Sequence, residues 1–352
     1  LVVFCFVSNA QENIDSTNSI EYAFYPQGFY TPETQFALGA GGMIYRRLGV
    51  DKYLPPSKAV FSGYYTTNNQ YSISIFPSIY FSGSAKAISE SKFIFNKELS
   101  KFYGIGNNTE EIENPEYEMG FFRFYTELGF ETDLIRNIHF GFIYDFTSVF
   151  NLDKKENQLL INNAILGQDG GKSSGLGLVV FVDNRNNLFY PTQSFFFKAR
   201  AIFMGSTLGG DYTYNRMVMD FRKYFDVGNE NIIASQIYFE TTSGDIPFFK
   251  LPALGGSERM RGYFLGRYRD ESYMAWQIEY RKIFWWRIGA VAFFGMGDVA
   301  KRIKQFDLSE FKYSYGFGVR FVFDEKENLN VRMDVGFGKN TAGVYFALEE
   351  AF

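Results

Sequence analysis

Apolar and polar residues alternate at every second position in many separate stretches of this sequence. The run from 329 to 337 is the clearest, with apolar residues at the odd positions and Asn, Arg, Asp and Gly at the even ones. The runs 71–81 and 274–280 show the same period. A strand repeats every two residues and a helix every 3.6, so this alternation predicts strands with one apolar and one polar face.

Turn-forming residues between such runs divide the chain into sixteen predicted strands. Their expected ranges are 20–28, 34–47, 57–67, 70–83, 88–100, 116–130, 134–150, 174–184, 192–206, 210–226, 230–243, 271–285, 287–299, 310–323, 328–339 and 342–352. An even number of strands brings both ends of an antiparallel chain to the same side, as bacterial single-chain barrels require.

Composition helps to decide between a soluble and a membrane β-protein. Aromatic residues make up 20% of the chain, yet the mean hydropathy is slightly negative, at −0.17. Beyond the start, no stretch approaches the roughly 18 consecutive apolar residues that a spanning helix needs. We therefore predict an all-β fold, a 16-stranded antiparallel transmembrane β-barrel of the bacterial outer membrane, with a soluble β-sandwich or propeller as the alternative.

The first residues indicate export. They are apolar and end in small residues before Gln11, which is typical of the end of a secretory signal peptide. We expect residues 1–10 to be the remnant of such a signal, 11–19 a short periplasmic N-terminus and 20–352 the barrel.

Lipidation of Cys5 is the competing interpretation of this start, but Phe4 before it is a poor fit to a lipobox. Cleavage near Gln11 removes Cys5, the one cysteine of the sequence, so disulfides and thiolate metal sites are not expected. The net charge of −4 gives no reason to expect nucleic acid as a partner.

Lipid offers no partner to the edge of an open sheet, so the first and last strands are expected to pair. The residues assigned to this seam are Tyr22 and Phe24 on the first strand and Val344, Phe346, Leu348 and Phe352 on the last. The alternation of the last strand and its terminal aromatic resemble the C-terminal β-signal by which outer-membrane barrels are recognised.

One loop carries a string that a generic barrel loop does not need. It lies between the predicted strands 230–243 and 271–285 and contains Gly255, Gly256 and the tetrad Met260-Arg261-Gly262-Tyr263. The tetrad resembles the hydrophobic-Arg-Gly-aromatic hallmark of the BamA/TamA superfamily, the bacterial surface antigen family. That resemblance implies an extracellular loop that folds back into the lumen.

Three further stretches are similar to the same family. They are 29–34, the Asp183-Asn184-Arg185 piece with Pro191, and 277–281. Two positions depart from it: Gly295 stands where the family has an acidic residue, and Ser194 where it often has Gly.

A guanidinium inside a partly dehydrated lumen is costly unless carboxylates accept its fork of donors. Alternation places Glu279 on the lumen side, and the resemblance implies that it contacts Arg261. Asp298 is the candidate substitute for the acid missing at Gly295; without it, Arg261 would depend on Glu279 alone. The open alternative is that Arg261 and Glu279 are separate, solvated lumen charges.

No catalytic constellation emerges from the sequence. The single histidine, His139, is predicted to face the lumen without a nucleophile or acid placed beside it. We expect no enzymatic activity, no cofactor and no metal.

The resemblance implies insertion or translocation of outer-membrane proteins through a weak seam between the first and last strands. Family members normally carry periplasmic POTRA domains, and residues 11–19 leave no room for one. We therefore expect a barrel domain without POTRA domains that uses separate periplasmic partners and contacts outer-membrane lipid and lipopolysaccharide. The alternatives are a structural or scaffold subunit of a larger outer-membrane complex, or a loop-plugged pore.

Overall fold

The computed structural model describes residues 20–31, 35–46, 57–81, 87–131, 138–325 and 328–352. The expected signal remnant at 1–10 and periplasmic N-terminus at 11–19 lie outside the described residues, as does part of the family-like stretch 29–34.

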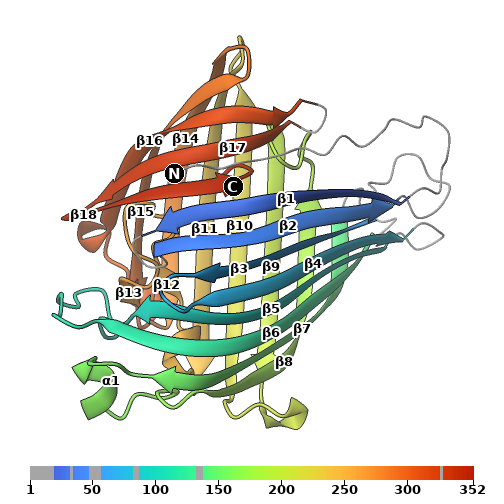
Figure 1. The fold of residues 1–352 in the computed structure, drawn as a ribbon. Helices are drawn as coiled ribbons and strands as arrows, with labels where there is room; N and C mark the ends of the chain where they lie inside the picture. The colour runs from blue at the N-terminus through green and yellow to red at the C-terminus, as the bar shows by residue number, and fades with distance from the viewer. Residues whose placement is uncertain (1–19, 32–34, 47–56, 82–86, 132–137, 326–327) are drawn as a thin grey trace. The chain divides into compact units, whose positions relative to one another are not determined.

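Sixteen strands form one sheet, in which each strand neighbours the next along the chain (Figure 1). They are β1 (Glu21–Thr31), β2 (Gln35–Arg46), β3 (Ser57–Thr66), β4 (Tyr71–Phe81), β5 (Ala87–Lys101), β6 (Glu116–Glu131), β7 (Ile138–Asp153), β8 (Gly171–Asp183), β9 (Ser194–Met204), β10 (Tyr214–Asp226), β11 (Asn231–Gly244), β14 (Ser272–Trp285), β15 (Ile288–Ala300), β16 (Lys312–Asp324), β17 (Leu329–Gly338) and β18 (Thr341–Leu348).

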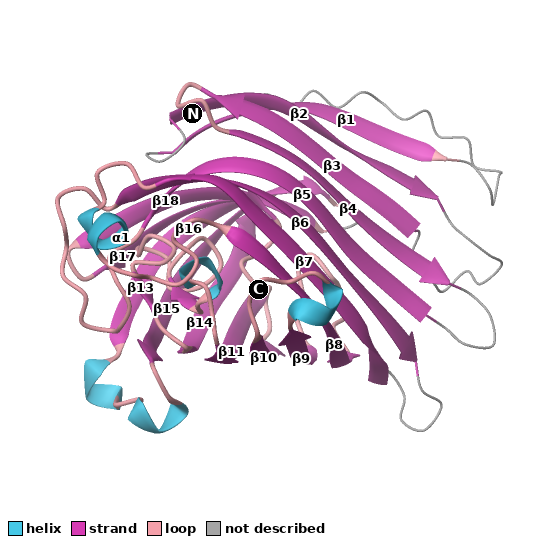
Figure 2. Ribbon diagram, turned by 90° about the horizontal axis from the view of Figure 1, so that it is seen from below, coloured by secondary structure: helices cyan, strands magenta, loops and turns pink. Residues whose placement is uncertain are grey.

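Little of the described chain is helical, as Figure 2 shows by colour. The short helix α1 (Gln158–Asn162) follows β7, and 3-10 turns lie at Ser206–Leu208, Phe248–Lys250, Ile303–Gln305 and Leu308–Glu310. No helix in the described ranges is both long enough and apolar enough to span a membrane.

The predicted strands all occur, and the differences lie at their ends. The strand predicted at 134–150 is observed at 138–153, and the one predicted at 174–184 begins three residues earlier. Two short strands of two residues each, β12 (Ala253–Leu254) and β13 (Tyr268–Arg269), pair with each other and were not predicted. They close the base of the loop that precedes β14.

The prediction that the last strand extends to Phe352 is wrong. β18 ends at Leu348, and Glu349 has a φ of +70°, which turns the chain out of the strand. Phe352 is buried beside Tyr224 and Ala234, and its carbonyl accepts a hydrogen bond of 3.0 Å from Nη2 of Arg281. The chain turns inward after Leu348 because the carboxylate of Glu350 binds buried arginines, which are described below.

Contacts divide the chain into two compact units. Within the described residues, the first comprises 20–100, 116–180 and 202–214, and the second comprises 101–115, 181–201 and 215–352.

Burial in the strands is the reverse of that in a soluble sheet. In β17 the polar residues are buried, with Asn330 1%, Arg332 3% and Asp334 0% exposed, whereas Met333 between them is 39% exposed. In β4 the serines at 72 and 74 are buried and the isoleucines at 73 and 75 are exposed. An apolar face turned outward and a polar face turned inward is the pattern of a membrane barrel.

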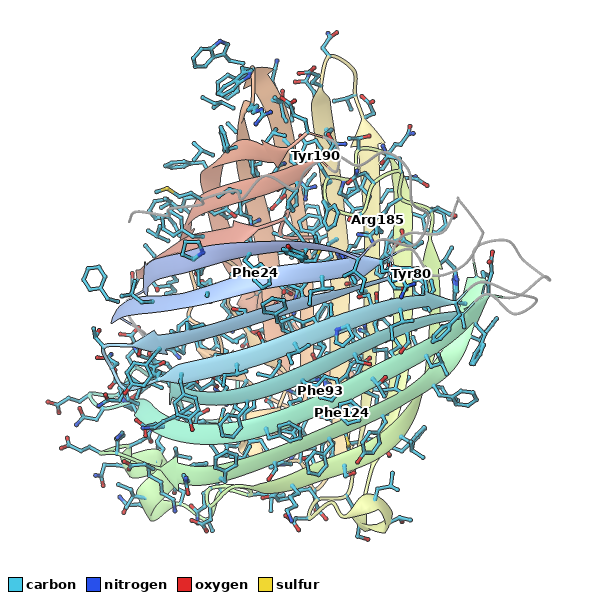
Figure 3. The ribbon with its side chains drawn as sticks, turned by 45° about the vertical axis from the view of Figure 1, so that its right-hand side comes forward. Phe24, Tyr80, Phe93, Phe124, Arg185 and Tyr190 are labelled. Atoms are coloured by element: carbon cyan, nitrogen blue, oxygen red, sulfur yellow. The ribbon has the colours of Figure 1, made fainter. Side chains whose placement is uncertain are left out.

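Aromatic side chains pair across neighbouring strands of the first unit. Phe93 of β5 and Phe124 of β6 stack with ring centroids 4.7 Å apart, and both are labelled in Figure 3. Cross-strand aromatic pairs of this kind stabilise the pairing of neighbouring strands. They also add apolar area to the face of the sheet on which the two rings lie.

The Asp183-Asn184-Arg185 piece starts at the last residue of β8 and continues into the connection to β9, where Arg185 and Tyr190 are labelled in Figure 3. Arg185 binds the carboxylate of Asp183 with two donors, Nε at 2.9 Å and Nη2 at 2.6 Å. Its guanidinium lies over the ring of Phe196, 4.7 Å from the centroid.

Ser194 begins β9 with a φ of +79°, a conformation that favours glycine. We expect Ser194→Gly to raise the free energy of unfolding by about 0.5–1 kcal/mol, because the relieved backbone strain exceeds the extra chain entropy of glycine. Urea unfolding monitored by tryptophan fluorescence measures the change, with Ser309→Gly, an exposed position without positive φ, as the control. A destabilised Ser194→Gly variant would contradict the strain argument.

Candidate functional site

The loop between β11 and β14 is the candidate site, and it lies wholly in the second unit. We call residues 255–267 the motif loop. Its base is closed by the β12–β13 pair and by a hydrogen bond of 2.9 Å from the Gly266 amide to the Leu254 carbonyl. Gly255 and Gly256 both have positive φ, and a Cβ on Gly255 would collide with the Phe264 carbonyl. Both glycines therefore let the loop turn back on itself.

Arg261 is fully buried at the centre of the motif loop. Its Nη2 pairs with Oε1 of Glu279 on β14, and its Nη1 donates to Oδ2 of Asp334 on β17 at 2.6 Å. The guanidinium also lies over the ring of Phe293, 3.6 Å from the centroid. The expected contact with Glu279 is present, so Arg261 and Glu279 are not separate solvated charges.

The second carboxylate is not the one that the sequence suggested. Asp298 accepts from Lys312 Nζ at 2.6 Å and from Asn107 Nδ2 at 3.2 Å, and no described contact joins it to Arg261. Asp334 takes the place of the acid missing at Gly295 and was overlooked. The signal was available, because alternation in 329–337 already placed Asp334 on the inward face.

Around Arg261 the buried charges form a closed circuit. Glu279 also binds Arg281, and Asp334 also binds Arg320 at 2.6 Å. Glu350, after the end of β18, accepts from Arg320 at 2.8 Å and lies 3.8 Å from Arg281. We call Arg261, Glu279, Arg281, Glu350, Arg320 and Asp334 the charge ring; positive and negative members alternate around it.

The motif loop rests on Gly336, the middle residue of a row of three glycines. Gly316 of β16, Gly336 of β17 and Gly343 of β18 are register partners across three strands. A Cβ on Gly336 would lie 2.6 Å from the backbone carbon of Arg261, and a Cβ on Gly262 would lie 2.5 Å from that of Phe337. The loop backbone therefore touches the backbone of β17 directly, which only residues without a side chain permit.

The other residues of the tetrad complete the docking. The Gly262 amide donates to the Tyr345 hydroxyl at 2.8 Å. The Tyr263 hydroxyl accepts from the Lys339 amide at 2.9 Å and donates to the Tyr313 carbonyl at 3.2 Å. Burial raises the pKa of the Tyr263 phenol, so the proton that it donates is retained at neutral pH. Met260 packs in a buried apolar cluster with Leu254 and other residues of the second unit.

The residues assigned to the seam are not brought together by any described contact. Tyr22 and Phe24 belong to the first unit, where they are exposed and in ring contact with each other. Val344 of β18 is exposed and Phe346 is half-buried. Pairing between β1 and β18 stays a prediction.

No cluster of three or more His, Cys, Asp or Glu suited to a metal ion occurs among the residues that the structure describes. The described contacts of the site are ion pairs, hydrogen bonds and close backbone contacts.

The Omp85 superfamily domain model matches residues 56–323, well over half of the chain. The chain belongs to the Omp85 superfamily. No curated protein matches this Omp85 sequence.

The crystal structure of BamA from Haemophilus ducreyi lacking POTRA domains 1–3 is similar to this Omp85 chain. The TM-score is 0.61, with 99% of this chain and 74% of that one covered at 13% sequence identity. At this identity the likeness shows the fold, which is that of an outer-membrane β-barrel. The predictions of the family, of sixteen antiparallel strands and of an outer-membrane location are confirmed.

We expect Arg261→Ala or Asp334→Asn in this Omp85 protein to lower the free energy of unfolding by about 3–5 kcal/mol, because each breaks buried ion pairs and leaves the remaining charges of the ring with fewer opposite charges. Heat-dependent migration on SDS gels measures stability, and proteinase K cleavage within 255–267 measures loop docking. Asp298→Asn is the matched control for loop docking, because Asp298 has no described contact with Arg261. If Asp334→Asn left the loop as protected as Asp298→Asn does, Asp334 would not be an anchor.

The glycine row makes a separate prediction. We expect Gly336→Ala to displace the motif loop and to increase its cleavage by proteinase K at least several-fold. Gly295→Ala is the matched control, because its added Cβ would meet its nearest atom, Cβ of Gln277, at an ordinary 3.4 Å. Equal loop protection in the two variants would show that close backbone contact is not what seats the loop.

Proposed function

We propose that this chain assists the insertion or translocation of outer-membrane proteins, acting with other outer-membrane or periplasmic proteins. The observation that carries the proposal is the motif loop, anchored by Arg261 to Glu279 and Asp334 and lying against the last strand. Membership of the Omp85 superfamily and the BamA-like fold support a barrel of the assembly or translocation type.

The last strand is suited to temporary pairing. β18 has eight residues and is the shortest of the sixteen strands in the sheet. A short strand offers few backbone hydrogen bonds to a permanent neighbour, and an edge of this kind can pair with an incoming extended segment. We propose that the edge of β18 is where a client strand pairs.

The exposed face of the strands suits a lipid environment, and we propose that it contacts outer-membrane lipid and lipopolysaccharide. Large apolar side chains such as Phe317, Val319 and Phe321 are exposed at alternating positions of β16. The charged residue Arg320, which lies between Val319 and Phe321, is buried instead.

We propose a non-enzymatic role. The one histidine of the sequence, His139, lies on β7 in the first unit, whereas the motif loop lies in the second. The described site consists of ion pairs that hold a loop and offers no nucleophile paired with a base.

The test uses the full chain reconstituted into liposomes of bacterial polar lipids, with an unfolded outer-membrane barrel as client. We expect client folding, followed by heat-modifiable migration, to be several-fold faster than in empty liposomes. Arg261→Ala should remove most of this acceleration, and Arg302→Ala, an exposed arginine between β15 and β16, should retain it.

Two outcomes would contradict the proposal. One is client folding no faster than in empty liposomes, including after addition of a periplasmic extract. The other is a steady ion conductance that Arg261→Ala does not alter, together with unaccelerated client folding, which would favour a pore.

A further inference from the structure

A cavity of about 840 Å³ lies among four segments of the second unit. Its lining residues come from 103–111 between β5 and β6, 263–268 at the end of the motif loop and in β13, 309–315 at the start of β16, and 338–341 at the β17–β18 turn. This volume lies within the range of small-molecule sites. No member of the charge ring lines the cavity, so the docking of Arg261 does not account for it.

The cavity lies at one end of the strands. The motif loop joins β11 to β14, and two further connections join β15 to β16 and β17 to β18. Each strand runs antiparallel to the next in the order β11-β14-β15-β16-β17-β18, so these three connections lie at the same end of the sheet. We expect this end to be extracellular. Exposed lining residues such as Glu111, Glu310 and Lys339 leave the cavity accessible to solvent.

One wall of the cavity is held in place by contacts within the protein. The Arg267 guanidinium lies over the rings of Tyr103 and Tyr268, 4.6 and 4.4 Å from their centroids. It also donates to the hydroxyl and carbonyl oxygens of Thr109, both at 3.0 Å. The ammonium of Lys312 lies 4.8 Å from the Tyr268 centroid. Side chains that are already fixed in this way lose little conformational freedom when a ligand binds.

Other polar side chains of the lining are not engaged by the protein. The side chains of Asn108, Glu111, Lys339 and Asn340 make no hydrogen bond or ion pair with another residue that the structure describes. Together they offer amide donors and acceptors, a carboxylate acceptor and an ammonium donor. The cavity therefore presents both kinds of hydrogen-bonding group to a ligand.

The charges around the cavity balance. The ammonium of Lys312 is bound to Asp298 at 2.6 Å, so Asp298 belongs to the same surroundings. Three positive and three negative groups are then present, namely Arg267, Lys312 and Lys339 against Glu111, Glu310 and Asp298. A cavity without net charge concentrates neither anions nor cations, which indicates a neutral polar ligand.

Aromatic side chains line the cavity between these polar groups. They include Tyr103, Phe264 and Tyr313, one from each of three segments. A ligand that fits must present apolar surface to the rings and hydrogen-bonding groups to the amides and carboxylates. A saccharide has this chemistry, because its ring carries C–H faces and its hydroxyl groups both donate and accept hydrogen bonds.

We propose that this cavity binds a neutral oligosaccharide. The proposal goes beyond the proposed function and does not depend on it, because the anchors of the motif loop take no part in the cavity. At an outer surface the same chemistry has two sources, the saccharide part of lipopolysaccharide and a free glucan.

The test measures binding of two probes to the full chain in phospholipid nanodiscs free of lipopolysaccharide. One probe is the deacylated, dephosphorylated core oligosaccharide of lipopolysaccharide, and the other is maltoheptaose. We expect saturable binding by isothermal titration calorimetry, with contact at the C–H protons of the sugar by saturation-transfer NMR. Binding of the core oligosaccharide assigns the cavity to lipopolysaccharide, and binding of maltoheptaose alone assigns it to a free glucan.

Two single variants locate the binding. We expect Glu111→Ala and Asn108→Ala each to raise Kd about three- to tenfold, because each removes a side chain that is free to hydrogen-bond the ligand. Glu113→Ala is the matched control for Glu111→Ala, because Glu113 is exposed on the same connection and does not line the cavity. Protection of 255–267 from proteinase K should be the same in all three variants, which checks that the fold is intact.

Binding of neither probe would overturn the proposal, as would a Kd that both Glu111→Ala and Asn108→Ala leave at the value of Glu113→Ala. A raised Kd in either variant retains it. A core oligosaccharide that binds only with its phosphates in place would also overturn it, because the cavity would then select a phosphate and not a neutral sugar.

Discussion

The buried guanidinium of Arg261 is the constraint on which the second unit depends. A charge at this depth is stable only if carboxylates compensate it at good geometry, and removing one partner of a buried ion pair costs about 3–5 kcal/mol. Glu279 and Asp334 supply that match from β14 and β17, two strands that are not neighbours in the sheet. The loop thus connects separate strands through one side chain. The carboxylates then recruit further arginines, so satisfying one charge arranges the others.

The glycines of β16, β17 and β18 are the steric counterpart of this electrostatic arrangement. An ion pair sets where the guanidinium points, but the loop backbone must first approach the sheet closely enough for the pair to form. Gly336 of β17 provides that approach, and Gly316 and Gly343 are its register partners on the neighbouring strands. Polar and small residues occupy the buried face and apolar residues the exposed face because the surroundings are lipid, which reverses the rule for soluble proteins.

Placing the end of β18 in the charge ring joins the edge of the sheet to its interior. Glu350 and Phe352 lie among buried arginines instead of continuing the strand. β18 is shorter as a result, and β18 is the strand that would exchange its pairing partner in the proposed function. It also attaches the end of that strand through contacts other than backbone pairing.

The sequence by itself determined the sixteen strands, their inner and outer faces and the loop that carries the tetrad. These features depend on local alternation and on turn residues, which any strand in this environment must obey. It also indicated the pairing of Arg261 with Glu279, because face and family resemblance agreed. Only the tertiary structure decided that Asp334 replaces Asp298 as the second anchor, that Gly336 seats the loop and that the chain turns inward after Leu348. The register of the strands and the path of the loop decide these contacts between distant residues. A one-residue shift in either would change every contact partner, yet the alternation of apolar and polar residues in the sequence would be the same.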